Sequence, residues 1–232
     1  MNMLSSTIGW ISALVILLSS LLFGGCFMGL FITHPPPAWT TLQAYAEACQ
    51  TYDQTLKHIA QASMIPLTIS ILVLIAILHE QVQTDRRFLS RLSLQFGSIT
   101  TCLISLGYFI QITSVRWNLS AGNIEDLAHF VQFYPNSVIL SIIMLGYTLF
   151  LGLSSVCIFP ILPDLPSYRL LRWGFLINAI SCGLGCIGFV GQIIPLILIA
   201  TNFGNGSAFI LLGIGGMKAF GKNNSQKNQM YL

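Results

Sequence analysis

Charged residues are scarce in this sequence and make up only 7% of its 232 residues. A soluble globular chain carries about a quarter charged residues, so this composition excludes an ordinary water-soluble domain. The sequence also lacks the alternating segments of about ten residues that build a membrane β-barrel. It has long continuous apolar runs instead, and such runs satisfy their backbone in lipid as helices. We therefore expect an all-α, polytopic transmembrane helical bundle.

Ionisable residues are absent from the apolar runs themselves. No Asp, Glu, Lys, Arg or His occurs within residues 8–32, 62–78, 96–115, 137–159 or 173–217. Proton relays and mid-membrane sites for charged substrates depend on such residues, so we do not expect ion-coupled transport. Haem held between two spans would also need histidines within them. The sequence identifies no cofactor.

The apolar runs place six spans, each of roughly 20 residues or more. They cover residues 8–32, 62–79, 96–115, 137–159, 172–191 and 195–218. Residues 1–221 would form a single integral membrane domain, followed by a polar cytoplasmic tail at 222–232. Two divisions of the last block are open, because length favours a break at 191–195 and turn residues favour one at 201–207. We favour the first, with an Asn/Gly-rich interruption inside the sixth helix.

The distribution of Lys and Arg predicts the orientation in the membrane. With the N-terminus inside, eight of the ten basic residues lie in inner segments and only Lys57 and Arg116 lie outside. Both termini are therefore expected to be cytoplasmic. The inner residues Arg86, Arg87 and Arg91 are candidates for contact with anionic lipid. So few basic residues do not indicate nucleic-acid binding.

Two outer segments are long enough to hold structure. In the first, apolar residues recur at helical spacing from Trp39 to Ile59, which predicts an amphipathic helix of about five turns. In the second, Asn123 is a candidate N-cap followed by two acidic residues, which predicts a short helix ending at Pro135. Ser137 is the expected cap of the fourth span.

The polar residues of the last apolar block, 173–217, are neutral, and they include Asn178, Gln192, Asn202 and Asn205. Their simplest role is hydrogen bonding between helices, which contributes modest energies. The alternative is a binding site for a neutral ligand beside a broken sixth helix, because unwound backbone at membrane depth lines a cavity or is buried in protein. The many glycines of these two helices indicate close helix packing or a dimer face.

Outer histidines and carboxylates are candidate metal-binding or acid–base groups. Glu125 and His129 stand at positions i and i+4, and His34 and His58 belong to the same side of the membrane. A transition-metal site needs three or four ligands in a definite geometry, and no HExxH or CxxC motif supplies them. Solvated loop charges are the competing interpretation. Only Cys49 of the six cysteines lies outside the apolar runs, so we expect no disulfide framework.

Two parts of the sequence resemble known proteins. The first hundred residues contain, in order, FITHPPPAW, LQAYAEACQTYDQTLKHIAQASMIPL and HEQVQTDRR, and a later stretch reads FVQFYPNSVILSIIMLGYTLFLGLSSVCIFPIL. Together they resemble a family of uncharacterised bacterial multi-spanning membrane proteins with a proline-rich first outer loop. The resemblance covers about half of the chain. It implies the fold and a bacterial plasma membrane, and it implies no activity or site residues.

These observations predict an integral membrane protein that is not itself an enzyme. It would bind a hydrophobic or neutral small molecule, or serve as an accessory subunit of a membrane assembly. Its partners would be the lipid bilayer and either another membrane protein or further copies of itself. A transporter or facilitator for a neutral solute is the first alternative. An outer-face enzyme that uses the histidines and carboxylates is the second.

Overall fold

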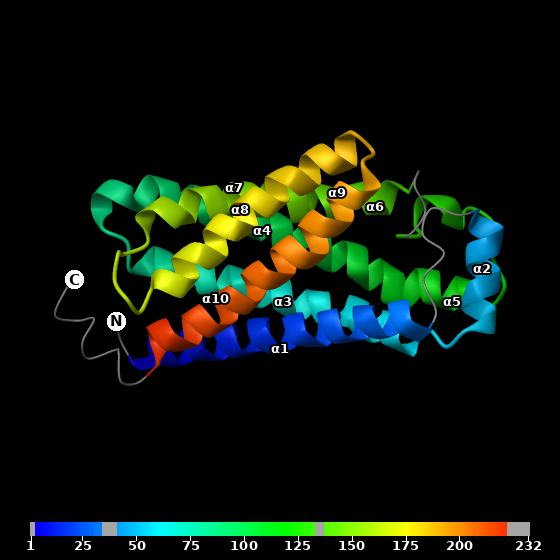
Figure 1. Ribbon diagram of the computed structural model, residues 1–232, viewed down its shortest axis with the longest axis horizontal. Helices are drawn as coiled ribbons and strands as arrows, with labels where there is room; N and C mark the ends of the chain where they lie inside the picture. The colour runs from blue at the N-terminus through cyan, green and yellow to red at the C-terminus, as the bar shows by residue number, and fades with distance from the viewer. Residues whose placement is uncertain (1–2, 34–40, 133–136, 222–232) are drawn as a thin grey trace.

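Long helices run side by side along the molecule in the computed structural model, which describes residues 3–33, 41–132 and 137–221 (Figure 1). These residues form helices and turns and contain no strand. Six helical segments among them are long and apolar enough to cross a membrane, which confirms a helical bundle with six candidate spans. They are α1 (Met3–Thr33), α3 (Thr55–Glu80), Thr84–Ser120, Val138–Ile161, α8 (Arg169–Val190) and Ile194–Phe220.

Three of these spans are interrupted by a π-helical turn. The third span contains η1 (Thr84–Arg86), α4 (Arg87–Ile110), η2 (Gln111–Val115) and α5 (Arg116–Ser120). The fourth contains α6 (Val138–Met144), η4 (Leu145–Phe150), α7 (Leu151–Ile158) and η5 (Phe159–Ile161). The sixth contains α9 (Ile194–Leu198), η6 (Ile199–Gly204) and α10 (Asn205–Phe220). The π-helical segments are η2, η4 and η6, and such turns occur frequently at functional sites.

The chain turns between its fifth and sixth spans at residues 191–193, the first of the two places considered above. Gln192 there has a φ of 55°, a left-handed conformation that does not continue a helix. The Asn/Gly-rich stretch from Thr201 to Ser207 lies inside the sixth span, where it forms the end of η6 and the start of α10. The turn chemistry of this stretch therefore distorts the helix without ending it.

The prediction of one continuous five-turn helix between Trp39 and Ile59 is wrong. The structure has a shorter helix, α2 (Leu42–Thr51), and Ile59 belongs to α3. Asp53 lies in the break, where its carboxylate accepts hydrogen bonds from the Thr55 N–H at 3.0 Å and the Thr55 hydroxyl at 2.7 Å. This contact two residues along the chain favours a turn before α3 begins. Trp39 lies outside the described residues.

The helix expected after Asn123 is also wrong. Residues 121–126 form turns, and only a single 3₁₀ turn, η3 (Leu127–His129), follows. Asp126 has a φ of 62°, which is incompatible with a continuous right-handed helix. Ser137 does cap the fourth span, because its hydroxyl accepts the Leu140 N–H at 3.2 Å.

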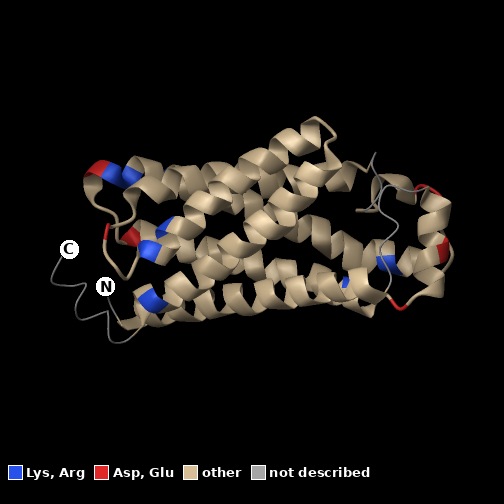
Figure 2. Ribbon diagram, viewed as in Figure 1, with Lys and Arg blue, Asp and Glu red and all other residues tan. Residues whose placement is uncertain are grey.

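The outer loops cover one end of the bundle. There Tyr45 and Ala46 of α2 pack into a buried cluster with four apolar residues of the third span and the following loop: Val115, Leu119, Leu127 and Val131. Figure 1 shows α2 lying across this end of the bundle. We call it the outer end, after the predicted orientation. The four outer-end acidic residues are Glu47, Asp53, Glu125 and Asp126, and Figure 2 shows most Lys and Arg at the opposite end.

The first and last spans cross near the inner end of the bundle. The Ser6 hydroxyl donates to the Phe220 carbonyl at 2.8 Å. A Cβ atom at Gly213 would lie 3.0 Å from the Ala13 carbonyl oxygen and 3.0 Å from the Leu17 Cα, so the two backbones are in close approach. From this crossing, α10 and α9 diverge from α1 towards the outer end (Figure 1). The divergence decides where the bundle leaves space.

Candidate functional site

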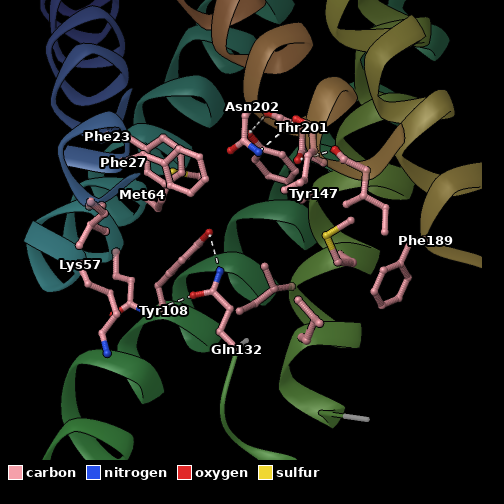
Figure 3. Close-up of a pocket in the computed structure, with 18 of the residues that line it drawn as sticks. Phe23, Phe27, Lys57, Met64, Tyr108, Gln132, Tyr147, Phe189, Thr201 and Asn202 are labelled. Atoms are coloured by element: carbon pink, nitrogen blue, oxygen red, sulfur yellow. Dashed lines mark hydrogen bonds between the residues drawn. The ribbon is translucent and has the colours of Figure 1, made fainter. Parts of the chain in front are cut away.

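A cavity of about 260 Å³ lies in the outer half of the bundle, where the sixth span has diverged from α1. An engineered apolar cavity of about 150 Å³ binds benzene, so this one has room for a larger apolar group. Its wall is largely aromatic and aliphatic, and Figure 3 shows several of these side chains around a common space. The apolar lining includes Phe23, Phe27, Phe31, Met64, Leu140, Ile143, Phe189 and Ile197.

A chain of hydrogen bonds between two side-chain amides and a tyrosine hydroxyl lies along one wall of the cavity. Gln61 of α3 donates its amide N–H to the Gln132 Oε1 at 3.0 Å, and Gln132 donates to the Tyr108 hydroxyl at 3.3 Å (Figure 3). Gln61 is only 4% exposed, and its Oε1 has no hydrogen-bond partner among the described residues. Exchanging the amide oxygen and nitrogen would leave an unpaired N–H instead. An unpaired buried polar atom costs about 1–3 kcal/mol.

The π turn of the third span holds this chain of hydrogen bonds in place. Gln111, in η2, is 2% exposed and donates its amide N–H to the Phe130 carbonyl at 2.5 Å. Its Oε1 accepts the backbone N–H of Gln132 at 3.2 Å. One side chain therefore satisfies two backbone groups of the outer loop and fixes the Gln132 side chain in the cavity wall.

The other two π turns contribute to the opposite wall. Tyr147, in η4, donates its hydroxyl to the Thr201 carbonyl of η6 at 3.4 Å. Thr201 and Asn202 both line the cavity, and the Asn202 amide donates to the Leu198 carbonyl one turn earlier at 3.1 Å. All three π-helical segments thus build or support the same space.

The cavity reaches the surface between α1 and the sixth span. Three of its lining residues are exposed, namely Phe31 at 44%, Ile194 at 37% and Leu198 at 40%. All three are apolar and belong to candidate spans. Side chains of this kind are stable against lipid, so the opening is lined by residues that suit contact with the bilayer.

Only one of the four predicted ligand-binding residues lines this cavity, and that residue is Asn202. Asn178 is fully buried and donates to the Ser155 hydroxyl at 2.7 Å. Asn205 is fully buried elsewhere, with its Oδ1 at 3.8 Å from the Cys182 Sγ, and Gln192 lies in the exposed turn after α8. The structure therefore places Asn178 and Asn205 in contacts between helices and does not gather the four.

The predicted metal ligands are spread over the outer end. His58 is half-buried in the first turn of α3, and Glu125 and His129 are exposed on the second outer loop. His34 lies outside the described residues. Among the described ranges, no group of three or more His, Cys, Asp or Glu side chains could hold a metal ion.

Sequence reasoning missed Gln61, Gln132 and Tyr108. Gln61 stands one position before the predicted second span, and Gln132 lies in a loop that was predicted to be helical. The only local signal was the polar character of the two glutamines. No family model matches the chain, and neither a curated protein nor a solved structure matches it.

Proposed function

We propose that this multi-pass membrane protein binds a hydrophobic small molecule in the cavity between α1 and the sixth span. The molecule would enter the cavity laterally from the lipid bilayer. The observation that carries the proposal is the mainly apolar cavity, open between α1 and the sixth span, whose lining includes the polar side chains of Tyr108, Gln132 and Asn202. Ligand sites combine a mainly apolar lining with a few placed polar groups. A ligand hydroxyl or amide would form hydrogen bonds with these groups while its apolar part fills the space.

The chemistry of the lining supports binding more than catalysis. It offers aromatic surface together with amides and hydroxyls, which are groups that recognise a ligand through packing and hydrogen bonds. A facilitator for a neutral solute is a second candidate, because η6 brings Thr201 and Asn202 to the cavity from an interrupted span. In transporters, interrupted helices of this kind form the substrate-binding site.

Filling the cavity is expected to displace the ligand. Ala60 lines the cavity and is 4% exposed, and Leu198 stands at its opening. We expect Ala60→Phe and Leu198→Trp each to lower ligand occupancy by about tenfold or more, because a loss of about 1.4 kcal/mol already corresponds to tenfold. Native mass spectrometry of the purified protein, with extraction and identification of the bound molecule, measures this occupancy.

The matched control is Leu106→Trp on α4, because Leu106 is 50% exposed on the bundle surface and does not line the cavity. Unchanged occupancy in both folded cavity variants would overturn the proposal. Flux of a neutral solute into proteoliposomes that is abolished by the same variants would favour the facilitator instead.

We also propose that both termini are cytoplasmic and that the host membrane is a bacterial plasma membrane, as the family resemblance implies. The charge bias between the two ends supports this orientation, and it makes Arg86, Arg87 and Arg91 the candidates for contact with anionic lipid. An accessory role beside another membrane protein or a second copy of the chain is compatible with the same cavity. The alternative of an enzyme at the outer face rests only on the candidate residues themselves, which do not form a cluster among the described residues.

Single-cysteine labelling tests the orientation. In a chain whose native cysteines are replaced, we expect Gln50→Cys on α2 to react with a membrane-impermeant maleimide added to intact cells. We expect Gln83→Cys, in the exposed loop between α3 and α4, to react only after the cells are opened. The reverse pattern would invert the topology.

A further inference from the structure

The side chain of Lys57 connects the apolar cavity to a second cavity at the outer end. Lys57 lines both of them, and it is only 7% exposed. Figure 3 shows its ammonium group directed away from the aromatic side chains Phe23 and Phe27. The aliphatic stem therefore borders the apolar space, and the charge lies on the outer side of it.

The second cavity, of about 310 Å³, lies between the end of α2, the first turn of α3 and α5. Its basic and titratable lining consists of Lys57, His58 and Arg116, together with Cys49. Lys57 and Arg116 are the two basic residues of the outer end among those described. Neither residue forms an ion pair with another described residue. The ion pairs of the described residues are Arg86–Asp85 and Arg172–Asp164, and both lie at the inner end.

The ammonium of Lys57 has neutral partners only. It donates to the Tyr45 hydroxyl at 3.0 Å and contacts the Cys49 Sγ at 3.4 Å, with the Tyr45 ring centroid at 5.1 Å. An ammonium has three N–H donors, so these two contacts leave one for a ligand. A buried charge without a counter-ion is costly, and an anion beside it removes that cost.

The Asp53 carboxylate, which lies near His58, already accepts hydrogen bonds from Thr55. It interacts with His58 through its charge. Its Oδ1 accepts both hydrogen bonds, from the N–H and the hydroxyl of Thr55. These hydrogen bonds lower the pKa of the exposed Asp53 carboxyl below its ordinary value. The stretches 34–40 and 133–136, which the structure does not describe, contain no Asp or Glu. No carboxylate of the described residues forms an ion pair with Lys57, so an anion from outside the chain has a place beside it.

We infer that the ligand is an anionic amphiphile, whose phosphate or carboxylate group lies at Lys57 with Arg116 and His58 and whose apolar chain lies in the cavity below. The inference rests on the proposed function, because it assigns the headgroup of the same ligand. Lys57 supplies the link, since one side chain borders both the chain-binding and the headgroup-binding space. Arg116, exposed on α5, adds a second cation to the same headgroup.

Two probes with the same chain test the inference on the full-length protein in detergent. They are oleoyl lysophosphatidic acid and monooleoylglycerol, and inorganic phosphate is a third probe without a chain. We expect the phosphate amphiphile to bind at least about tenfold more tightly than the neutral one, as charge-assisted hydrogen bonds predict. Lys57→Met should reduce this preference, which is the ratio of the two affinities, to about twofold or less.

Further variants separate the possible outcomes. Arg116→Gln should lower the preference by about threefold, and Lys57→Arg should retain it, because the charge is kept. Arg91→Gln at the inner end is the matched control and should change nothing. Equal binding of both amphiphiles to the unmodified protein, or an unchanged preference in Lys57→Met, would overturn the headgroup assignment.

The proposed function itself fails by a different result. If neither amphiphile binds, or if Ala60→Phe leaves both affinities unchanged, the cavity is not the chain-binding site. Inorganic phosphate that binds as tightly as the phosphate amphiphile would show a free-anion site and would overturn the amphiphile assignment. A Lys57→Met variant that fails to fold leaves Arg116→Gln and Lys57→Arg to decide.

Discussion

Replacing Gly213 by leucine is expected to destabilise the bundle by about 3 kcal/mol or more, the upper part of the range for overpacking a core. A Cβ at this position would lie 2.7 Å from the Leu17 Cβ and 3.0 Å from the Ala13 carbonyl oxygen. Those atoms include backbone of α1, which cannot move aside without shifting the whole helix. The thermal unfolding midpoint of the detergent-solubilised protein measures the effect.

The matched control is Gly206→Leu on the same helix. A Cβ at Gly206 would meet no atom within 4 Å, so this substitution has space and should leave the unfolding midpoint nearly unchanged. Equal midpoints for the Gly213 and Gly206 variants would contradict the close crossing of α1 and α10. Because this crossing sets how far the sixth span diverges from α1, any folded Gly213→Leu protein should also lose ligand occupancy.

Replacing Gln111 by leucine is expected to cost about 2 kcal/mol of stability or more, because it leaves two partly buried backbone groups unpaired at about 1–3 kcal/mol each. These groups are the Phe130 carbonyl and the Gln132 N–H. The outer loop should then detach from η2 and take the Gln132 side chain away from Gln61. We therefore expect a lower unfolding midpoint together with reduced ligand occupancy.

Hydrogen exchange distinguishes this mechanism from a general loss of packing. Amides of residues 127–132 should exchange faster in Gln111→Leu, while those of α8 and α10 should change little. Gln95→Leu is the control, because Gln95 is exposed on α4, which precedes η2 in the same span. Unchanged exchange at residues 127–132 would contradict the anchoring role of Gln111.

Local signals predicted local structure well in this chain. The apolar runs predicted the helical bundle, and the Ser137 cap predicted where the fourth span begins. The same kind of signal failed in both outer loops. Helical spacing continued from Trp39 to Ile59, but a turn in which the Asp53 carboxylate accepts the Thr55 N–H separates α2 from α3. In the second loop, the backbone is bound by Gln111, a residue of another element.

Hydropathy and charge along the chain suffice to predict the helical class, the number of candidate spans and the separation of charge between the two ends, because they act on each segment independently. The packing of the helices is needed to see that Gln61 meets Gln132 across 71 residues of sequence and that Lys57 borders two cavities. The same packing leaves Asn178 and Asn205 out of the cavity lining. The physical reason is that the cavity is the space left where α1 and the sixth span diverge, and that angle depends on the close contact of Gly213 with α1.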